Sequence, residues 1–246
     1  MPWHRLHERI AVLERSQPPL IDRAAWFVAC EMIEGDYLEF GTFKGHAFAA
    51  AYHAFQRAFE RRIALLPEEA TDEQRARRRT IWESMNFVAL DSFEGLPTLE
   101  GVDRVSEDFR QGQYGVSQAS FERAVAGMGV PPQRTVVIPG WYAETSNAAT
   151  WESHSITKAA VIWIDCDLYA STRDALAGLG PLLQDGTVLI FDDWFAFKAN
   201  PNRGEQRAFA EWREGVAGFD FVHFHSEGTW RNSFVAVARD VEGEPP

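Results

Sequence analysis

The segments AAVIWID (residues 159–165) and GTVLIFDD (residues 186–193) predict two consecutive buried strands of a parallel sheet. Each is apolar and rich in β-branched residues, and each stops on acids: Asp165 in the first, the pair Asp192-Asp193 in the second. Open α/β sheets bind ligands at the carboxyl ends of their strands. A single aspartate there often only caps the next helix, but acids at both ends favour a site. Three hard oxygen donors suit Mg²⁺, Mn²⁺ or Ca²⁺.

Helices and strands alternate along the rest of the chain. Helices are expected at 3–15, 21–34, from Gly45 to about 62, and at 118–128. Further strands are expected at 37–40, 86–91 and 135–138, with an antiparallel hairpin at 219–224 and 233–238. This order predicts an α/β fold with a doubly wound, Rossmann-like sheet, mostly parallel with a C-terminal antiparallel hairpin, as in class I methyltransferases. We expect one domain over 1–246, with N-terminal helices in 1–34 and a charged helical insertion near 63–84.

The net charge and the amino-acid composition limit the kinds of partner that this protein is expected to bind. The 246 residues include 36 acidic and 24 basic side chains, a formal net charge of −12, which disfavours nucleic acid as a partner. The basic run at 75–79 follows acidic residues, an order typical of a solvated helix face, and a subunit contact in a homo-oligomer is the alternative. Cys30 and Cys166 form no CxxC motif and are expected to be reduced. Without an apolar leader or a membrane-length segment, we expect a soluble, cytoplasmic protein.

The turn after the first strand is the expected place for a cofactor. Glu39 begins the pattern Glu-x-Gly-x-x-x-Gly, which ends at Gly45. Gly41 allows a tight turn and Gly45 allows close helix packing. The pattern is not the Gly-x-Gly-x-x-Gly of dinucleotide enzymes, which makes NAD or FAD less suitable. Asp91, at the end of the second strand, is placed to accept both hydroxyls of a ribose, although it could instead cap the segment that follows.

Together these segments resemble the macrocin O-methyltransferase (TylF-type) family. The resemblance spans about residues 35–238 and rests on LEFGTFKG (38–45), DSFEGLP (91–97), PGWY (139–142), IDCDLY (164–169) and the aspartate pair at 192–193. It implies a methyltransferase that depends on S-adenosyl-L-methionine and Mg²⁺ and acts on a sugar hydroxyl of a natural product, a small-molecule acceptor. The charged insertion departs from the compact family pattern.

The resemblance to this family, together with the glycine turn after the first strand, implies which residues form the site. Metal ligation is expected from Asp165, Asp192 and Asp193, and Asp165 would also accept the hydroxyl proton. Asp167 is left outside the metal shell, because its direction depends on whether the strand continues past Cys166. Contacts with the cofactor are expected from Glu39, Phe40, Gly41, Thr42, Gly45, Asp91, Ser92, Gly140 and Trp141.

Other readings remain open at this stage. A catechol-type phenol O-methyltransferase would use the same three acids. A metal-dependent hydrolase would use them to activate water and would leave the glycine turn idle, and a non-catalytic binding module is a third option. His223 and His225 share a strand face, but we expect packing roles. Trp194, Trp230 and Arg231 are expected near the rim of the site, where they could line an acceptor pocket.

Overall fold

The computed structural model describes residues 18–67 and 70–239. The expected helix at 3–15 and the acidic C-terminal residues lie outside these ranges. The helix expected at 21–34 is α2 (Leu20–Glu31), and Met32 ends it in the left-handed conformation. Within the described ranges, no helix is both long and apolar enough to cross a bilayer.

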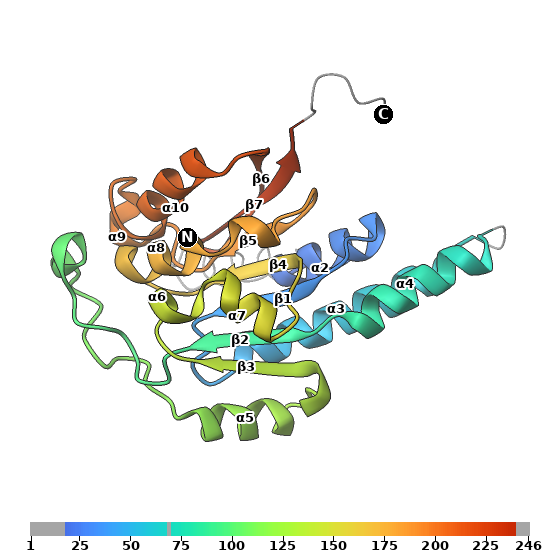
Figure 1. Cartoon of the computed structure of the whole chain (residues 1–246), viewed down its shortest axis with the longest axis horizontal. Helices are drawn as coiled ribbons and strands as arrows, with labels where there is room; N and C mark the ends of the chain where they lie inside the picture. Colours follow the sequence, from blue (N-terminus) through green and yellow to red (C-terminus); the bar gives the residue numbers. More distant parts are fainter. Residues whose placement is uncertain (1–17, 68–69, 240–246) are drawn as a thin grey trace, which may run out of the picture.

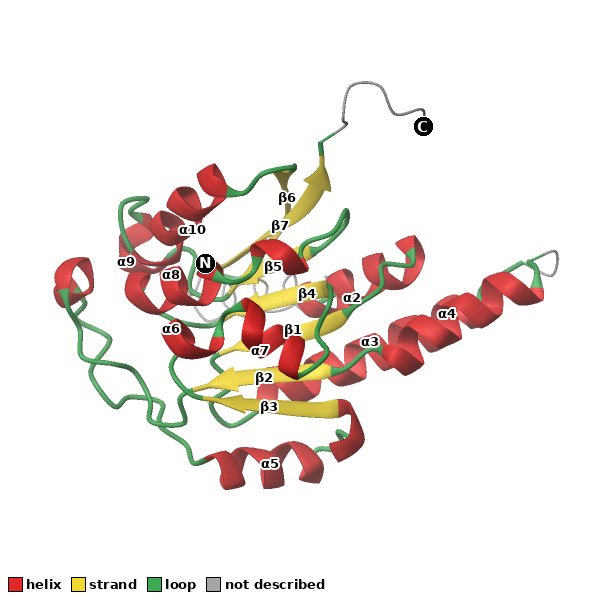
Figure 2. Cartoon of the chain, in the orientation of Figure 1, coloured by secondary structure: helices red, strands yellow, loops and turns green. Residues whose placement is uncertain are grey.

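A seven-stranded sheet organises the described residues, in the order β3-β2-β1-β4-β5-β7-β6 (Figures 1 and 2). The first five strands pair in parallel, and β7 joins β5 and β6 antiparallel. The fold is therefore the predicted class I methyltransferase arrangement, mostly parallel with an antiparallel hairpin. The strands are β1 (Asp36–Phe40), β2 (Phe87–Asp91), β3 (Thr135–Pro139), β4 (Ala159–Ile164), β5 (Val188–Phe191), β6 (Phe219–Glu227) and β7 (Arg231–Ala238).

The central strands are apolar throughout because helices cover both faces of the sheet. Alternate residues of β1 enter different cores: Tyr37 faces one cluster and Leu38 the other. The first core is packed by α2, α3 (His46–Ala64), α4 (Asp72–Ser84) and α5 (Gln118–Gly127). The second is packed by α6 (Tyr142–Thr145), α7 (Ala148–Ser153), α8 (Tyr169–Ala177) and α10 (Gly204–Gly215). Short 3₁₀ turns are η1 (Gly101–Val105), η2 (Pro132–Arg134) and η3 (Gly180–Leu182).

Strand register aligns the chain segments that carry the expected site. Ile164 pairs with both Phe40 and Phe191. The ladder then continues one residue past the strands, because the N–H of Asp165 donates to the Phe40 carbonyl at 2.8 Å and that of Asp192 to the Ile164 carbonyl at 2.9 Å. The acids that follow β4 and β5 therefore lie at the same edge of the sheet, as their sequence positions predict.

The charged segment at 63–84 includes the end of α3 and all of α4. Helix α3 continues to Ala64, and α4 begins with a capping box in which Thr71 and Gln74 bond reciprocally. Figure 1 shows both helices extending beyond the edge of the sheet. The base of α4 is held by Arg134, which donates to the carbonyls of Trp82 and Met85. In the basic run, Arg78 is only 5% exposed, which corrects the expectation of a uniformly solvated face.

One short turn departs from ordinary backbone geometry. In α9 (Ala196–Ala199), Phe197, Lys198 and Ala199 have φ angles of 55°, 60° and 56°. For side chains other than glycine, this left-handed conformation costs about 1 kcal/mol or more per residue. The surrounding structure must therefore hold this segment in place.

Candidate active site

A cavity of about 300 Å³ opens at the carboxyl ends of the parallel strands, the edge at which α/β sheets bind ligands. The loop between β2 and α5 covers it with Leu96, Pro97, Phe109 and Tyr114. Most of the expected site residues line this cavity, namely Gly41, Asp91, Ser92, Gly140, Trp141, Asp165, Asp192 and Asp193.

The glycine turn is shaped by two close approaches. At Gly41, with φ of 87°, a Cβ atom would lie 1.9 Å from the carbonyl oxygen of Asp165. At Gly45, with φ of 76°, it would lie 2.4 Å from Cγ1 of Val125 on α5. Gly41 therefore lets the turn close against β4 beside the cavity. Gly45 has a packing role against α5 and does not line the cavity.

Asp91 fastens this turn from the neighbouring strand. Its Oδ2 accepts hydrogen bonds from the backbone N–H of Thr42 (2.8 Å), the Thr42 hydroxyl (3.2 Å) and the N–H of Phe43 (3.2 Å). Its Oδ1 accepts from the N–H of Phe93 at 2.8 Å. The carboxylate thus fixes the shape of the turn as well as facing the cavity, and Thr42 is turned toward Asp91.

Glu39 and Phe40 do not line the main cavity. The Phe40 side chain is buried in the core, with its ring 5.4 Å from that of Tyr142. Glu39 is completely buried and accepts a hydrogen bond from the Tyr37 hydroxyl at 2.5 Å. Burial raises the Glu39 pKa to about 8. Its Oε1 has no partner among the described residues, and neither has the ring N–H of Trp163. Glu39 and Trp163 both line a second hollow.

Three carboxylates converge at the floor of the main cavity. One oxygen from each of Asp165, Asp167 and Asp193 lies within 4.8 Å of the others, and this is the one such group of acids, histidines or cysteines in the described ranges. Asp167, which we expected outside the metal shell, therefore lies in the same group as Asp165 and Asp193. The strand does end at Ile164, but Asp167 adopts a left-handed conformation, with φ of 59°, and lines the cavity.

Asp192 occupies a different environment from its neighbour Asp193. Its Oδ1 accepts a hydrogen bond from Nε of Arg231 at 2.5 Å. Arg231 also pairs with Glu227 and lies over the Trp163 ring, 5.4 Å from its centroid. Asp192 thus lines the cavity beside the three-carboxylate cluster, with one oxygen committed to a cation.

The three-carboxylate cluster is stabilised when its carboxyl groups bind protons or when it binds a cation. Burial, together with the neighbouring carboxylates, raises the Asp167 pKa to about 8 and the Asp193 pKa to about 6. The same causes raise the pKa of Asp165 well above its usual range. Because like charges at this spacing repel, a divalent ion would relieve the repulsion. An all-oxygen donor set of this kind fits Mg²⁺, Mn²⁺ or Ca²⁺.

Sequence reasoning missed Glu205, which lies behind the cluster. It is buried in the first turn of α10, and its Oε2 accepts the N–H of Asp193 at 3.0 Å. Its Oε1 has no partner among the described residues, and burial raises its pKa well above the usual range. No sequence motif marks this residue, because its role depends on how α10 docks.

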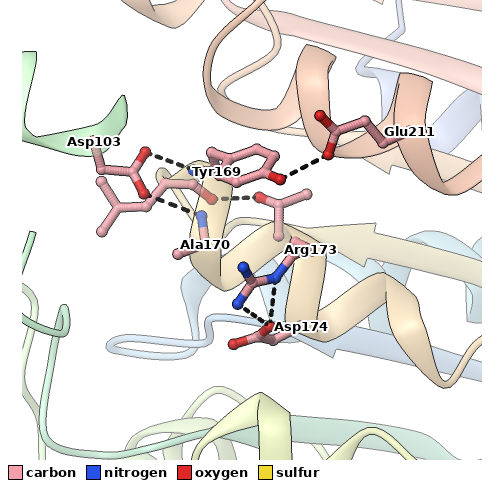
Figure 3. A network of polar contacts seen from close by, with 8 residues as sticks. Asp103, Tyr169, Ala170, Arg173, Asp174 and Glu211 are labelled. Carbon is pink, nitrogen blue, oxygen red and sulfur yellow. Dashed lines mark hydrogen bonds and ion pairs between the residues drawn. The ribbon is translucent and has the colours of Figure 1, made fainter. Parts of the chain in front are cut away.

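Sequence reasoning also missed the attachment of the covering loop (Figure 3). Asp103, buried in η1, accepts hydrogen bonds from the N–H groups of Tyr169 (2.9 Å) and Ala170 (3.1 Å) at the start of α8. The Tyr169 hydroxyl donates to Glu211 on α10 at 2.7 Å. The loop that covers the cavity is therefore fastened two residues beyond Asp167. An isolated aspartate in a long polar segment gives no sequence signal for this contact.

Comparison with known proteins adds to this geometry. The sequence pattern of a family described as macrocin-O-methyltransferase (TylF) matches residues 20–215. The chain belongs to the macrocin O-methyltransferase family. Among curated relatives, it is 27% identical to mycinamicin III 3''-O-methyltransferase of Micromonospora griseorubida over 169 residues, 66% of this chain and 56% of that protein.

Two further comparisons concern a second curated relative of this macrocin O-methyltransferase family member and a solved structure with a similar fold. The 8-demethyl-8-(2,3-dimethoxy-alpha-L-rhamnosyl)-tetracenomycin-C 4'-O-methyltransferase of Streptomyces olivaceus is 36% identical over 110 residues, 42% of this chain and 40% of that protein. The chain thus spans about half or less of the length of these curated relatives. The solved structure of the O-methyltransferase NovP has a similar fold, with a TM-score of 0.64 and 21% identity, covering 88% of this chain and 78% of that one.

Three residues were expected at the rim of the site: Trp194, Trp230 and Arg231. In this member of the macrocin O-methyltransferase family they lie in different surroundings. Trp194 packs against Phe191 and Phe234, with ring centroids 5.1 Å and 5.0 Å away. Arg231 reaches inward to Asp192, whereas Trp230 is exposed on the outer side. His223 bonds to Asn232 within the hairpin.

Proposed function

We propose that this protein transfers a methyl group from S-adenosyl-L-methionine to a hydroxyl of a small molecule that carries a sugar. The observation that carries the proposal is one cavity that joins a glycine turn and Asp91 to a cluster of carboxylates. Membership of the macrocin O-methyltransferase family supports the reaction. The two curated relatives are named as O-methyltransferases, one of mycinamicin III and one of a rhamnosyl-tetracenomycin C.

The cofactor would lie along the turn after β1. Asp91 faces the cavity, and its Oδ1, which accepts only the N–H of Phe93, retains a lone pair for a ribose hydroxyl, whereas Oδ2 is already occupied by three donors. Ser92 and the Gly140-Trp141 segment would border the adenine, with the Trp141 ring as an apolar wall. The backbone around Gly41 would face the methionine part. Glu39 would contact the cofactor from the neighbouring hollow, which it lines, because its Oε1 has no partner among the described residues.

The acceptor hydroxyl would lie at the carboxylates. Asp165, Asp192 and Asp193 would hold a divalent ion, with Asp167 as a further oxygen donor from the same cluster. When bound, Mg²⁺ would lower the pKa of the hydroxyl and orient its oxygen. Asp165 would accept the hydroxyl proton, because its carboxyl lines the cavity beside the other acids of the cluster. Methyl transfer then depends mainly on alignment of the two reactants.

The alternatives are less well supported. A hydrolase would have no use for the glycine turn and Asp91, which share the cavity with the acids. No feature of the cavity favours a catechol over a sugar diol, and a series of diol acceptors would separate the two.

Cys30 and Cys166 are both free thiols, which supports a reducing compartment such as the cytoplasm.

Calorimetric titration with S-adenosylhomocysteine tests the cofactor assignment. We expect the wild-type protein to bind it, and Asp91→Asn to weaken binding roughly tenfold or more through loss of a charged hydrogen-bond acceptor. Asp174→Asn, on α8 and paired with Arg173, is the matched control and should bind normally. Circular dichroism would verify folding, and absence of binding by the folded wild-type protein, with and without Mg²⁺, would refute the proposal.

A further inference from the structure

The first turn of α10 lies against the segment that leaves β5. The N–H of Asp192 still belongs to the sheet, because it donates to the Ile164 carbonyl at 2.9 Å. The next N–H, that of Asp193, has left the sheet and donates instead to Oε2 of Glu205 at 3.0 Å. The backbone direction at Asp193, and with it the direction of its carboxylate, therefore depends on a side chain of α10.

A second hydrogen bond from α10 holds the same segment. Nε2 of Gln206, the residue after Glu205, donates to the Trp194 carbonyl at 2.7 Å. The Trp194 ring also packs edge to face against Phe209 of this helix, with centroids 5.7 Å apart. Two consecutive side chains of α10 thus bind two consecutive residues after β5, and the helix holds this turn as one unit.

Helix α10 also contacts the segment that follows Asp167. Glu211 accepts a hydrogen bond from the Tyr169 hydroxyl at 2.7 Å (Figure 3). The guanidinium of Arg207 lies over the Tyr169 ring, 4.6 Å from its centroid. One helix therefore packs against both of the chain segments that bring Asp167 and Asp193 into the three-carboxylate cluster.

Glu205 is not placed to bind an ion at the cluster. It does not belong to the group of three acids whose oxygens lie within 4.8 Å of one another, and it does not line the main cavity. It is 1% exposed, and it forms no ion pair within the described residues.

Burial of this carboxyl group is costly. Its Oε1 has no partner among the described residues, and a buried polar atom without a partner destabilises the folded state. A leucine of similar size would avoid this cost. The contact with the Asp193 N–H is therefore what distinguishes Glu205 from a packing residue.

We propose that Glu205 is a positioning residue for the metal site. By accepting the N–H of Asp193, it fixes the direction of the Asp193 carboxylate toward Asp165 and Asp167, without binding the ion itself. Residues that orient metal ligands in this way typically change metal affinity by about 10- to 100-fold when they are removed. The inference rests on the proposed function for the presence of a divalent ion. It adds that metal affinity depends on how α10 docks, and not on the aspartates alone.

Binding of Mn²⁺ to three variants tests the inference, measured by electron paramagnetic resonance of the free ion and without cofactor. Glu205→Leu removes the acceptor at similar volume, and we expect it to weaken Mn²⁺ binding roughly tenfold or more. Glu205→Gln retains an oxygen that can accept the Asp193 N–H and should restore binding close to that of wild type. Glu214→Leu, at an exposed position in the last turn of α10, is the control and should bind like wild type.

Three results would overturn the inference. Equal Mn²⁺ binding by Glu205→Leu and wild type would mean that Asp193 is held without Glu205. An equal loss in Glu205→Gln and Glu205→Leu would mean that the charge, and not the accepted hydrogen bond, is what matters. Absence of Mn²⁺ binding by the wild-type protein would remove the metal site itself.

S-adenosylhomocysteine separates this inference from the proposed function. Failure of the wild-type protein to bind it refutes the proposed function, whereas Mn²⁺ binding is measured without it. Glu205→Leu should lose Mn²⁺ affinity and keep its affinity for S-adenosylhomocysteine, because the glycine turn is unchanged. Loss of both would indicate general damage and would also contradict a positioning role. Circular dichroism verifies folding, and Glu205→Ser, whose side chain is too short to reach the Asp193 N–H, replaces Glu205→Leu if the latter does not fold.

Discussion

Glu39 keeps its proton at neutral pH because its carboxyl is buried beneath the glycine turn. Its pKa is about 8, against an ordinary value of 4.5. Since the folded protein binds this proton more tightly than the unfolded chain, the stabilisation is complete below pH 4.5 and is lost as pH rises through about 8. The effect amounts to a few kcal/mol, at about 1 kcal/mol or slightly more for each pKa unit.

Replacing this acid by its neutral analogue should remove the pH dependence. In Glu39→Gln the amide oxygen can still accept from Tyr37, and no proton is lost on raising the pH. We expect the melting temperature of the variant, relative to wild type, to rise between about pH 5 and about pH 8. Thermal unfolding across this range measures it, with the exposed Glu60→Gln on α3 as control. A constant difference between Glu39→Gln and wild type would contradict a raised pKa.

The position of a site residue could be predicted from the sequence where the residue follows a strand. It could not be predicted where the residue lies in a turn or on a docked helix. Asp165 and Asp193 follow apolar strands, so the position of each is given by strand register. Asp167 reaches the cluster only through a left-handed residue in the following turn. Glu205 meets Asp193 because of how α10 docks. Such contacts depend on tertiary packing, and residue type alone does not reveal them.

At the scale of elements, the covering loop and α8 are joined chiefly by Asp103. This carboxylate caps two N–H groups at the positive end of the α8 dipole. We expect Asp103→Ala to free the loop and to accelerate tryptic cleavage at Arg104 and Arg110, by roughly tenfold if about 1.4 kcal/mol of local stability is lost. Timed proteolysis of the folded protein measures this.

Two variants distinguish capping from general damage to the loop. Asp103→Asn retains one oxygen acceptor and should be cleaved at an intermediate rate. Glu100→Ala changes an exposed side chain of the same loop and should be cleaved like wild type. Equal cleavage of Asp103→Ala and wild type would mean that other contacts hold the loop.

Element boundaries were less predictable than element order. The segment 63–84 reads as charged and helical, but only the structure shows that α3 extends to Ala64 and that a capping box starts α4. Arg78 is buried, although it lies in a run of basic residues that resembles a solvated face. The polar stretch 94–117 gave no indication that η1 docks on α8.

For the molecule as a whole, the carboxylate cluster links stability to pH and to metal. The raised pKa values of Asp167 (about 8) and Asp193 (about 6) mean that the folded protein holds extra protons above pH 3.8. Without metal, this contribution to stability therefore falls as pH rises toward about 8. A divalent cation binds the ionised form, so Mg²⁺ should raise the melting temperature more at about pH 8 than at about pH 5.

Scanning calorimetry with Mg²⁺ or with a chelator measures this linkage. In Asp167→Asn, one titrating carboxylate is gone, so both the fall with pH and the stabilisation by Mg²⁺ should be smaller than in wild type. Asp174→Asn again serves as control. If Mg²⁺ stabilised the protein equally at both pH values, the cluster would not be the metal site.

The overall fold was predictable because several independent signals agree. Alternating strands and helices, a terminal hairpin and motifs in family order all indicate the same doubly wound sheet, which the structure has. Local consistency of this kind is what makes a sequence fold to one structure. The opening of about 350 Å³ between the covering loop, α9 and the hairpin turn was not predictable, because these segments are distant in sequence.

The turn of the β6–β7 hairpin places two neighbouring residues in different surroundings, with Trp230 facing outward and Arg231 facing Asp192. A recombinant that exchanges this hairpin with that of a relative would therefore transplant both environments at once. The exposed aromatic surface and the electrostatics of the carboxylates would change together and could not be selected separately by such a swap. Point substitutions at Trp230 alone would alter that surface and leave the Arg231–Asp192 pair in place.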